Sequence, residues 1–330
     1  MDAVGHILED EERDLRRVTE FMQDSGFPDD MLQLWMENEQ EALRDASKGE
    51  NWLLRPLDVT MRSIRGISVL MLSAFMERFG LQVDVMAQAV AVLDVYWHRS
   101  IDATDVRSIP NVCFSICRTM LKVHMKRHQV TNLQTEDLQS MAEWFQQTAS
   151  VISGQAVDVS IQDSGEQELR ILKAVDLRID IPTAFTWLAA FHIRLAAAAP
   201  ADLAPTLGLG RERGEELGKM LTQQFSLFDI PPHRLARGLL GCGLMMAGLL
   251  PAEALHFQDL IGAEAWQRLL DLTPTPGGPA AAPQWPAMGR EEEERLHGLV
   301  VLSMGCDRGD FHAAVLDVVH LLTYGGVATV

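Results

Sequence analysis

The sequence predicts an all-α protein built from two successive groups of about five helices each, with further helices at both ends. Apolar side chains recur at the three- and four-residue spacing of one helix face in most of the long segments. The chain contains 16 Met but only 2 Tyr, a composition that favours helix over strand. Pro182 and Thr183 separate the two groups, because proline removes a backbone donor and restricts the residue before it.

Residues 1–57 form an acidic N-terminal helical extension, in which Asp and Glu clearly outnumber Lys and Arg. Apolar residues keep a rough helical stripe through this extension. We expect two helices here, separated by the Gly-Phe-Pro sequence at 26–28.

The N-terminal main domain is expected at 58–181, with about five or six helical segments. Pro110 suits the first turn of one helix, and Thr135 suits the capped start of another. The polar stretch 158–165 is predicted to be a turn that precedes a helix over residues 166–179.

The C-terminal main domain is expected at 182–272, and one of its helices begins after Pro231 and Pro232. Small residues on this helix should let neighbouring helices approach closely; they are Ala236, Gly238, Gly241 and Gly243. Residues 208–214, GLGRERG, follow no strand and match no phosphate-binding motif, so we expect a loop and a helix start.

The last region, 273–330, is expected to contain a Pro/Gly/Ala linker and two C-terminal amphipathic helices. The run Glu291 to Glu294 is interpreted as the acidic first turn of one of these helices.

The net charge and the cysteine pattern of the chain indicate which binding partners and which cellular compartment to expect. The net charge of -18 argues against a nucleic-acid partner and against an anionic membrane surface, which both require positive fields. The apolar runs are too short for a membrane span, and no signal peptide is recognised. Cys113, Cys117, Cys242 and Cys306 lie in apolar helical surroundings, a pattern typical of reduced buried thiols. We therefore expect an intracellular protein, in the nucleus, the cytoplasm or both.

Charged residues within two apolar helical blocks indicate a buried ion pair. Arg65 and Asp94 each lie beside the apolar stripe of their own block. A charge in that position is costly unless it is paired, so we expect the two residues to face one another when their helices pack.

Short motifs in a fixed order carry a resemblance to a known family. Residues 64–68 resemble an M-R-A-I-L motif, 93–97 an L-D-R-F-L motif, and 120–124 retain the lysine of an A-S-K-[YF]-E-E motif. Residues 168–175 and 179–183 match an E-x-x-x-L-x-x-L helix that is followed by an apolar and acidic pair and Pro-Thr. Together with Pro232, this order resembles the paired helical repeats of the cyclin family, over roughly residues 57–272.

The resemblance implies two tandem five-helix cyclin-fold domains and a division of labour among four residues. Lys122 would donate to the backbone of a kinase partner, and Glu168 would accept from it. Arg65 and Asp94 would be an internal ion pair that supports the domain.

A substrate-docking patch would lie at Ile64, Ile67 and Met71 on the first helix of the box. Ser68 replaces the leucine of the family motif at this place. The alternative interpretation is that all three residues belong to the core.

No residues with a recognisable catalytic, cofactor or metal-binding pattern were found, so we expect neither an enzyme nor a metal or cofactor site. His124 and His128 have an i, i+4 spacing, but no carboxylate or cysteine pattern accompanies them. Cys113 and Cys117 lack a second pair of ligands.

The expected function is that of a cyclin-like regulatory subunit, which forms a heterodimer with a cyclin-dependent serine/threonine kinase and activates it. The alternative is a cyclin-fold adaptor or scaffold that binds partners without activating a kinase. Cyclin-fold transcription factors are a third class, disfavoured by the charge and by the absence of CxxC pairs. An all-helical enzyme is a fourth, with no motif behind it.

Overall fold

The computed structural model confirms the all-α class: its described residues form helices and connecting turns, without strands. The described residues are 32–37, 39–40, 59–100, 108–124, 135–177, 179, 182–224, 230–272 and 290–324. No single helix among them is long and apolar enough to cross a membrane, whereas α11 (Pro232–Met246) and α12 (Pro251–Ile261) reach that length and composition only as a pair bent by 106°.

The chain divides into two compact units. The N-terminal unit combines Glu39–Thr183 with Thr222–Asp229, and the C-terminal unit combines Met1–Asn38, Ala184–Leu221 and Ile230–Val330. The sequence placed the boundary between the main domains at residues 181 and 182 and set 273–330 apart. In the structure, residues 290–324 belong to the C-terminal unit.

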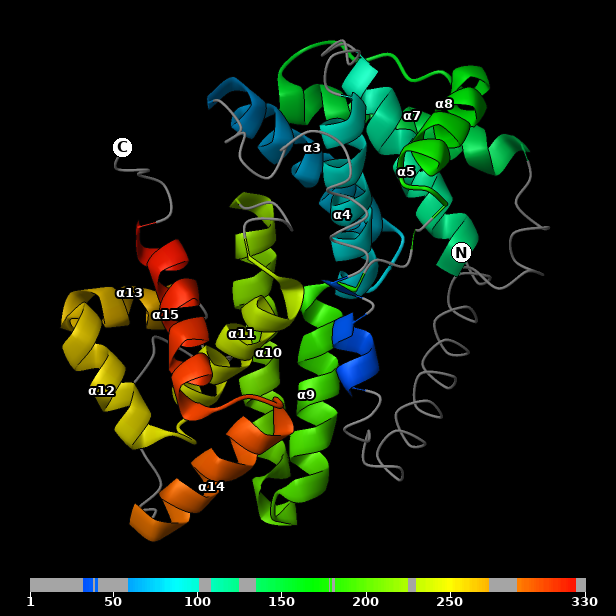
Figure 1. Ribbon diagram of the computed structural model, residues 1–330. Helices are drawn as coiled ribbons and strands as arrows, with labels where there is room; N and C mark the ends of the chain where they lie inside the picture. Colours follow the sequence, from blue (N-terminus) through cyan, green and yellow to red (C-terminus); the bar gives the residue numbers. More distant parts are fainter. Residues whose placement is uncertain are drawn as a thin grey trace. The chain divides into compact units, whose positions relative to one another are not determined.

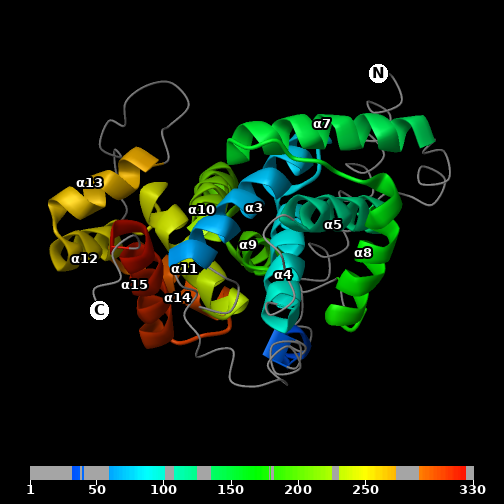
Figure 2. The ribbon, with the colours of Figure 1, turned by 90° about the horizontal axis from the view of Figure 1, so that it is seen from above.

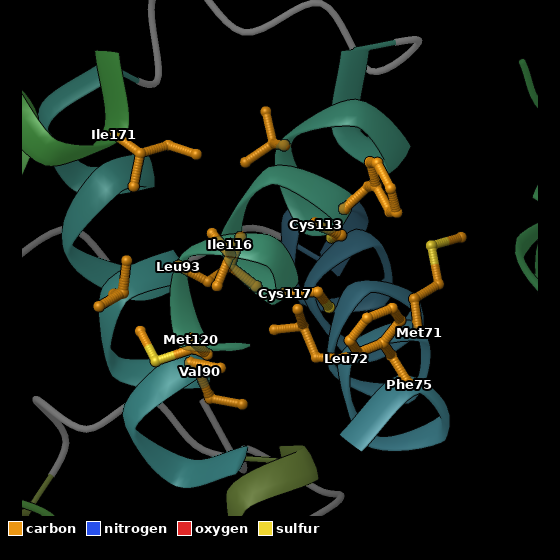
Figure 3. Packing of buried hydrophobic residues seen from close by; sticks show 14 of the residues in the cluster. Met71, Leu72, Phe75, Val90, Leu93, Cys113, Ile116, Cys117, Met120 and Ile171 are labelled. Carbon is orange, nitrogen blue, oxygen red and sulfur yellow. The ribbon is translucent and has the colours of Figure 1, made fainter. Parts of the chain in front are cut away.

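In the N-terminal unit, α5 is the central helix and packs against each of the four other described helices (Figure 1, Figure 2). The helices are α3 (Val59–Arg78), α4 (Val83–Ser100), α5 (Ile109–His124), α7 (Thr135–Ser153) and α8 (Ile161–Ala174). Almost every side chain of α5 before Lys122 is buried, which explains why most of them are apolar. Figure 3 shows this core, with Cys113, Ile116, Cys117 and Met120 of α5 among Met71, Leu72 and Phe75 of α3 and Val90 and Leu93 of α4.

Helix α8 begins and ends earlier than the sequence predicted. The Ser160 side chain caps the helix by accepting a hydrogen bond from the backbone N–H of Asp163 at 3.2 Å. Residues 161–165 are therefore the first turn of α8 and not part of the preceding turn. The helix ends at Ala174, and Asp176 and Leu177 then take left-handed backbone angles, with φ of 52° and 60°.

In the C-terminal unit, α11 packs against α9, α12 and α15 (Figure 1). The helices are α9 (Ala184–Ala198), α10 (Ala204–Gln224, whose residues up to Leu221 belong here), α11 (Pro232–Met246), α12 (Pro251–Ile261), α13 (Ala263–Leu272), α14 (Arg290–Ser303) and α15 (Arg308–Tyr324).

The small residues of α11 predicted that neighbouring helices approach it closely, and the structure confirms this for α10 and α15. A Cβ atom added to Gly238 would lie 2.2 Å from the Ala314 carbonyl oxygen of α15, and one added to Gly243 would lie 2.0 Å from the Gly210 carbonyl oxygen of α10. The loop predicted at 208–214 is wrong, because these residues lie inside α10. Gly210 and Gly214 let α10 contact α11, and that packing outweighs the low helix propensity of glycine.

Histidine burial in α9 predicts that acid destabilises the C-terminal unit. The Nε2 atom of His192 is buried without a hydrogen-bond partner. Burial, and secondarily the charge of Arg211, lower the pKa of His192 to about 4. In the folded state, His192 therefore binds a proton less readily than it does in the unfolded chain, where the pKa of a histidine is about 6.5. With respect to His192, the free energy of unfolding is therefore highest above about pH 6.5, where the imidazole is neutral in both states. It decreases as the pH falls towards 4.

We expect His192→Phe to lose less stability than the wild type when urea unfolding is compared at pH 7 and at about pH 4.5. An identical loss in both proteins would show that His192 does not contribute to the acid sensitivity.

Candidate functional site

A buried ion pair joins α3 and α4 of the N-terminal unit. Arg65 Nε donates to Asp94 Oδ1 at 2.8 Å, and Arg65 Nη2 donates to Asp94 Oδ2 at 3.0 Å. Both side chains are only 2% exposed. The third nitrogen, Nη1, donates to the backbone oxygens of Thr222 and Gln223, which belong to the same unit, at 3.2 and 3.3 Å. This bidentate pair holds α3 to α4 and is out of reach of a partner.

The two residues assigned to partner binding meet at the junction of α5 and α8. Lys122 Nζ donates to Glu168 Oε2 at 2.6 Å. The Lys122 side chain is 42% exposed, whereas that of Glu168 is only 11% exposed. An ammonium group has three donors, so Lys122 can bind a further acceptor while it holds Glu168. Lys122 is therefore the accessible member of the pair.

Arg118 is a third member of this site that sequence reasoning missed. Its Nε lies 3.2 Å from Glu168 Oε1, but the two atoms are misaligned for a hydrogen bond. Arg118 Nη1 donates to the Ser164 hydroxyl one turn earlier on α8. Two cations thus surround one carboxylate, so the site carries local positive charge on an acidic chain. The sequence could have indicated Arg118, because it lies four residues before Lys122 on α5 and residues at this spacing share one face of a helix.

An exposed apolar residue follows each member of the pair in the sequence. Val123 follows Lys122 and is 50% exposed, and Leu169 follows Glu168 and is 52% exposed. Most large apolar residues of these two helices are buried, so both are exceptions. Apolar groups beside a few polar anchors are typical of the surfaces that proteins use to bind one another.

The docking patch suggested for α3 is not displayed as a surface. Met71 is 2% exposed and lies in the core (Figure 3), while Ile64 and Ile67 are half-buried and pack against that core. The buried Ser68 hydroxyl donates to the Ile64 carbonyl oxygen at 2.9 Å. The structure therefore favours the alternative, in which these residues support the core.

The cysteines and His124 occupy protected positions. Cys113, Cys117 and Cys242 are free and buried, and Cys306 is free and half-buried. Burial raises the pKa of Cys113 and of Cys242 to about 12, so these thiols stay protonated and unreactive. His124 Nε2 lies 2.9 Å from Gln88 Oε1, and burial lowers the pKa of its imidazole. His128, four residues after His124, lies outside the described residues.

Comparison with models of known protein families and with curated proteins finds no match to this chain.

Proposed function

We propose that the protein is a cyclin-like regulatory subunit that binds a cyclin-dependent protein kinase and activates it. The observation that carries the proposal is the meeting of Lys122 and Glu168, 46 residues apart in the chain, in one ion pair with an accessible ammonium group. The buried pair of Arg65 and Asp94 supports the same proposal, because the order of all four residues matches the cyclin motifs.

The proposed fold is a tandem of two cyclin-fold domains. Helix α5 is surrounded by its neighbours in the N-terminal unit, and α11 packs between α9 and α15 in the C-terminal unit. A helix buried on several sides needs an apolar or small-residue sequence, which both have. Under this proposal, α14 and α15 are an addition to the second repeat.

The proposed mechanism is allosteric. Lys122 would donate to a backbone carbonyl of the kinase, and Glu168, whose side chain is only 11% exposed, would accept from Lys122 and hold it in position. Val123 and Leu169 would add apolar contact. A rigid helical surface that binds the active conformation of the kinase more tightly shifts the kinase population towards it. In that conformation the regulatory helix of the kinase places its glutamate against the strand lysine, as phosphoryl transfer requires.

Loss of the ion pair at α5 and α8 should weaken kinase binding. Hydrogen bonds to charged groups contribute about 1.5–3 kcal/mol each. We therefore expect the Lys122→Ala, Glu168→Ala double variant to bind at least about tenfold more weakly than the wild type. The measurement is the calorimetric Kd for a purified cyclin-dependent kinase.

Two further variants make this test specific. Glu166→Ala removes an exposed carboxylate from the same helix, where Glu166 pairs only loosely with Arg170 at 3.7 Å, and should leave binding unchanged. Lys122→Ala alone changes a half-exposed side chain, so it should fold and still weaken binding. Equal affinity of the wild type and of both lysine variants would show that the assigned surface is wrong.

A cyclin-fold adaptor is the second candidate, and the burial of Met71 favours it. Some cyclins dock substrates on their first helix, but the corresponding patch is not displayed on α3. An adaptor would bind the kinase with full affinity and leave its rate of phosphoryl transfer unchanged.

A further inference from the structure

Two histidines and a glutamate from three helices converge in the C-terminal unit. Glu253 lies on α12, His297 on α14 and His312 on α15 (Figure 1). His312 Nε2 is 2.6 Å from Glu253 Oε2, and His297 Nε2 is 3.6 Å from Glu253 Oε1. One ligand atom from each residue can be chosen so that all three lie within 4.8 Å of one another.

His297 provides a second observation that points to a ligand at this cluster. Its side chain is 7% exposed, and its Nε2 atom is buried without a hydrogen-bond partner. Buried polar atoms are nearly always satisfied, because an unpaired one loses its hydration without compensation. Glu253 Oε1, at 3.6 Å, is too far away for a hydrogen bond. His297 Nε2 is thus left unsatisfied beside Glu253 and His312, where a bound ion would satisfy it.

We propose that Glu253, His297 and His312 form a zinc-binding site. Two imidazole nitrogens and one carboxylate oxygen are a donor set that Zn²⁺ accepts, with water at the fourth position. Calcium and magnesium prefer all-oxygen sites, so the two histidines disfavour them. Ligand bonds of about 2.0–2.2 Å in a tetrahedron place ligand atoms about 3.3–3.6 Å apart. The three ligand atoms lie within 4.8 Å of one another, so binding requires the side chains to adjust around the ion.

Arg308 fits this site as a supporting residue. Its Nη2 lies 2.5 Å from Glu253 Oε1, and its side chain is largely exposed. A carboxylate has two oxygens, so one oxygen of Glu253 can bind the ion while Arg308 holds the other. Residues that hydrogen-bond to a metal-binding carboxylate without contacting the ion commonly fix its orientation. The bound ion would join α12, α14 and α15 and stabilise their packing.

Zinc titration of the full chain tests the site. The protein is stripped with a chelator and titrated with ZnCl₂ against a chromogenic zinc indicator, and Co²⁺ is used in parallel as a spectroscopic probe. We expect one zinc ion per chain, the visible absorption of four-coordinate Co²⁺, and a higher Tm with zinc. His312→Gln and His297→Gln should each weaken binding by at least about tenfold.

The control is His320→Gln, which removes another histidine from α15 and should leave zinc affinity unchanged. His312 is partly exposed, so its variant is the one expected to keep the fold, as checked by circular dichroism. Absence of stoichiometric zinc binding by the wild type would overturn the proposal. Equal zinc affinity of the wild type, His312→Gln and His320→Gln would also overturn it, because the ion would then bind elsewhere.

Discussion

Arg65→Ala is expected to lower the free energy of unfolding by about 3–5 kcal/mol. The substitution leaves the Asp94 carboxylate buried without its bidentate partner, and the group is 2% exposed. It also removes the donor that binds the carbonyl oxygens of Thr222 and Gln223. Breaking one side of a buried pair is costlier than replacing both sides, because the remaining charge stays buried after it has lost its oppositely charged partner.

Urea unfolding of the variant and of Arg62→Ala measures this effect. Arg62 is exposed on the same helix, so its loss should change stability by less than about 0.5 kcal/mol. Replacing the pair together, as Arg65→Met with Asp94→Leu, should recover much of the loss. If Arg65→Ala and Arg62→Ala unfold at the same urea concentration, the pair does not support the domain.

Gly243→Ala is expected to destabilise the C-terminal unit by about 1–3 kcal/mol or more, the usual cost of overpacking. The new methyl group would lie 2.0 Å from the Gly210 carbonyl oxygen and 2.9 Å from the Gly214 backbone nitrogen. Both are backbone atoms of α10, so the two helices must separate to relieve the contact. The gain in helix propensity from alanine, about 0.5–1 kcal/mol, opposes this cost but does not cancel it.

Gly208→Ala is the matched control, because Gly208 lies on α10 with no atom within 4 Å of an added Cβ. It should stabilise the protein by about 0.5–1 kcal/mol through helix propensity alone. Thermal unfolding of the two variants should therefore move Tm in opposite directions. A rise in Tm for both would contradict close contact between α10 and α11.

The helical class and the meeting of distant charged residues could be predicted because both follow from periodicity. The convergence of Arg65 with Asp94 depends on which face of its helix each residue occupies, and spacing reveals that face. The close approach at Gly238 and Gly243 could be predicted for the same reason, since glycines inside an apolar helix need a packing explanation.

Other features depend on tertiary packing that spacing does not contain. Residues 208–214 read locally as a loop, but contact with α11 at Gly210 and Gly214 keeps them helical. Glu253, His297 and His312 come from three helices, and only the packing of those helices brings them together. The sequence is compatible with Met71 either on the surface or in the core. The packing of the neighbouring helices places it in the core.

Phosphoryl transfer by a cyclin-dependent kinase, measured with and without this protein, tests the central claim most directly. If the protein is a cyclin-like activator, saturating amounts should raise the rate at a fixed kinase concentration, and Lys122→Ala should require a higher concentration for the same rise. Binding that leaves the rate unchanged would contradict activation and support the adaptor. A kinase that neither binds the protein nor responds to it would contradict the cyclin-like assignment itself.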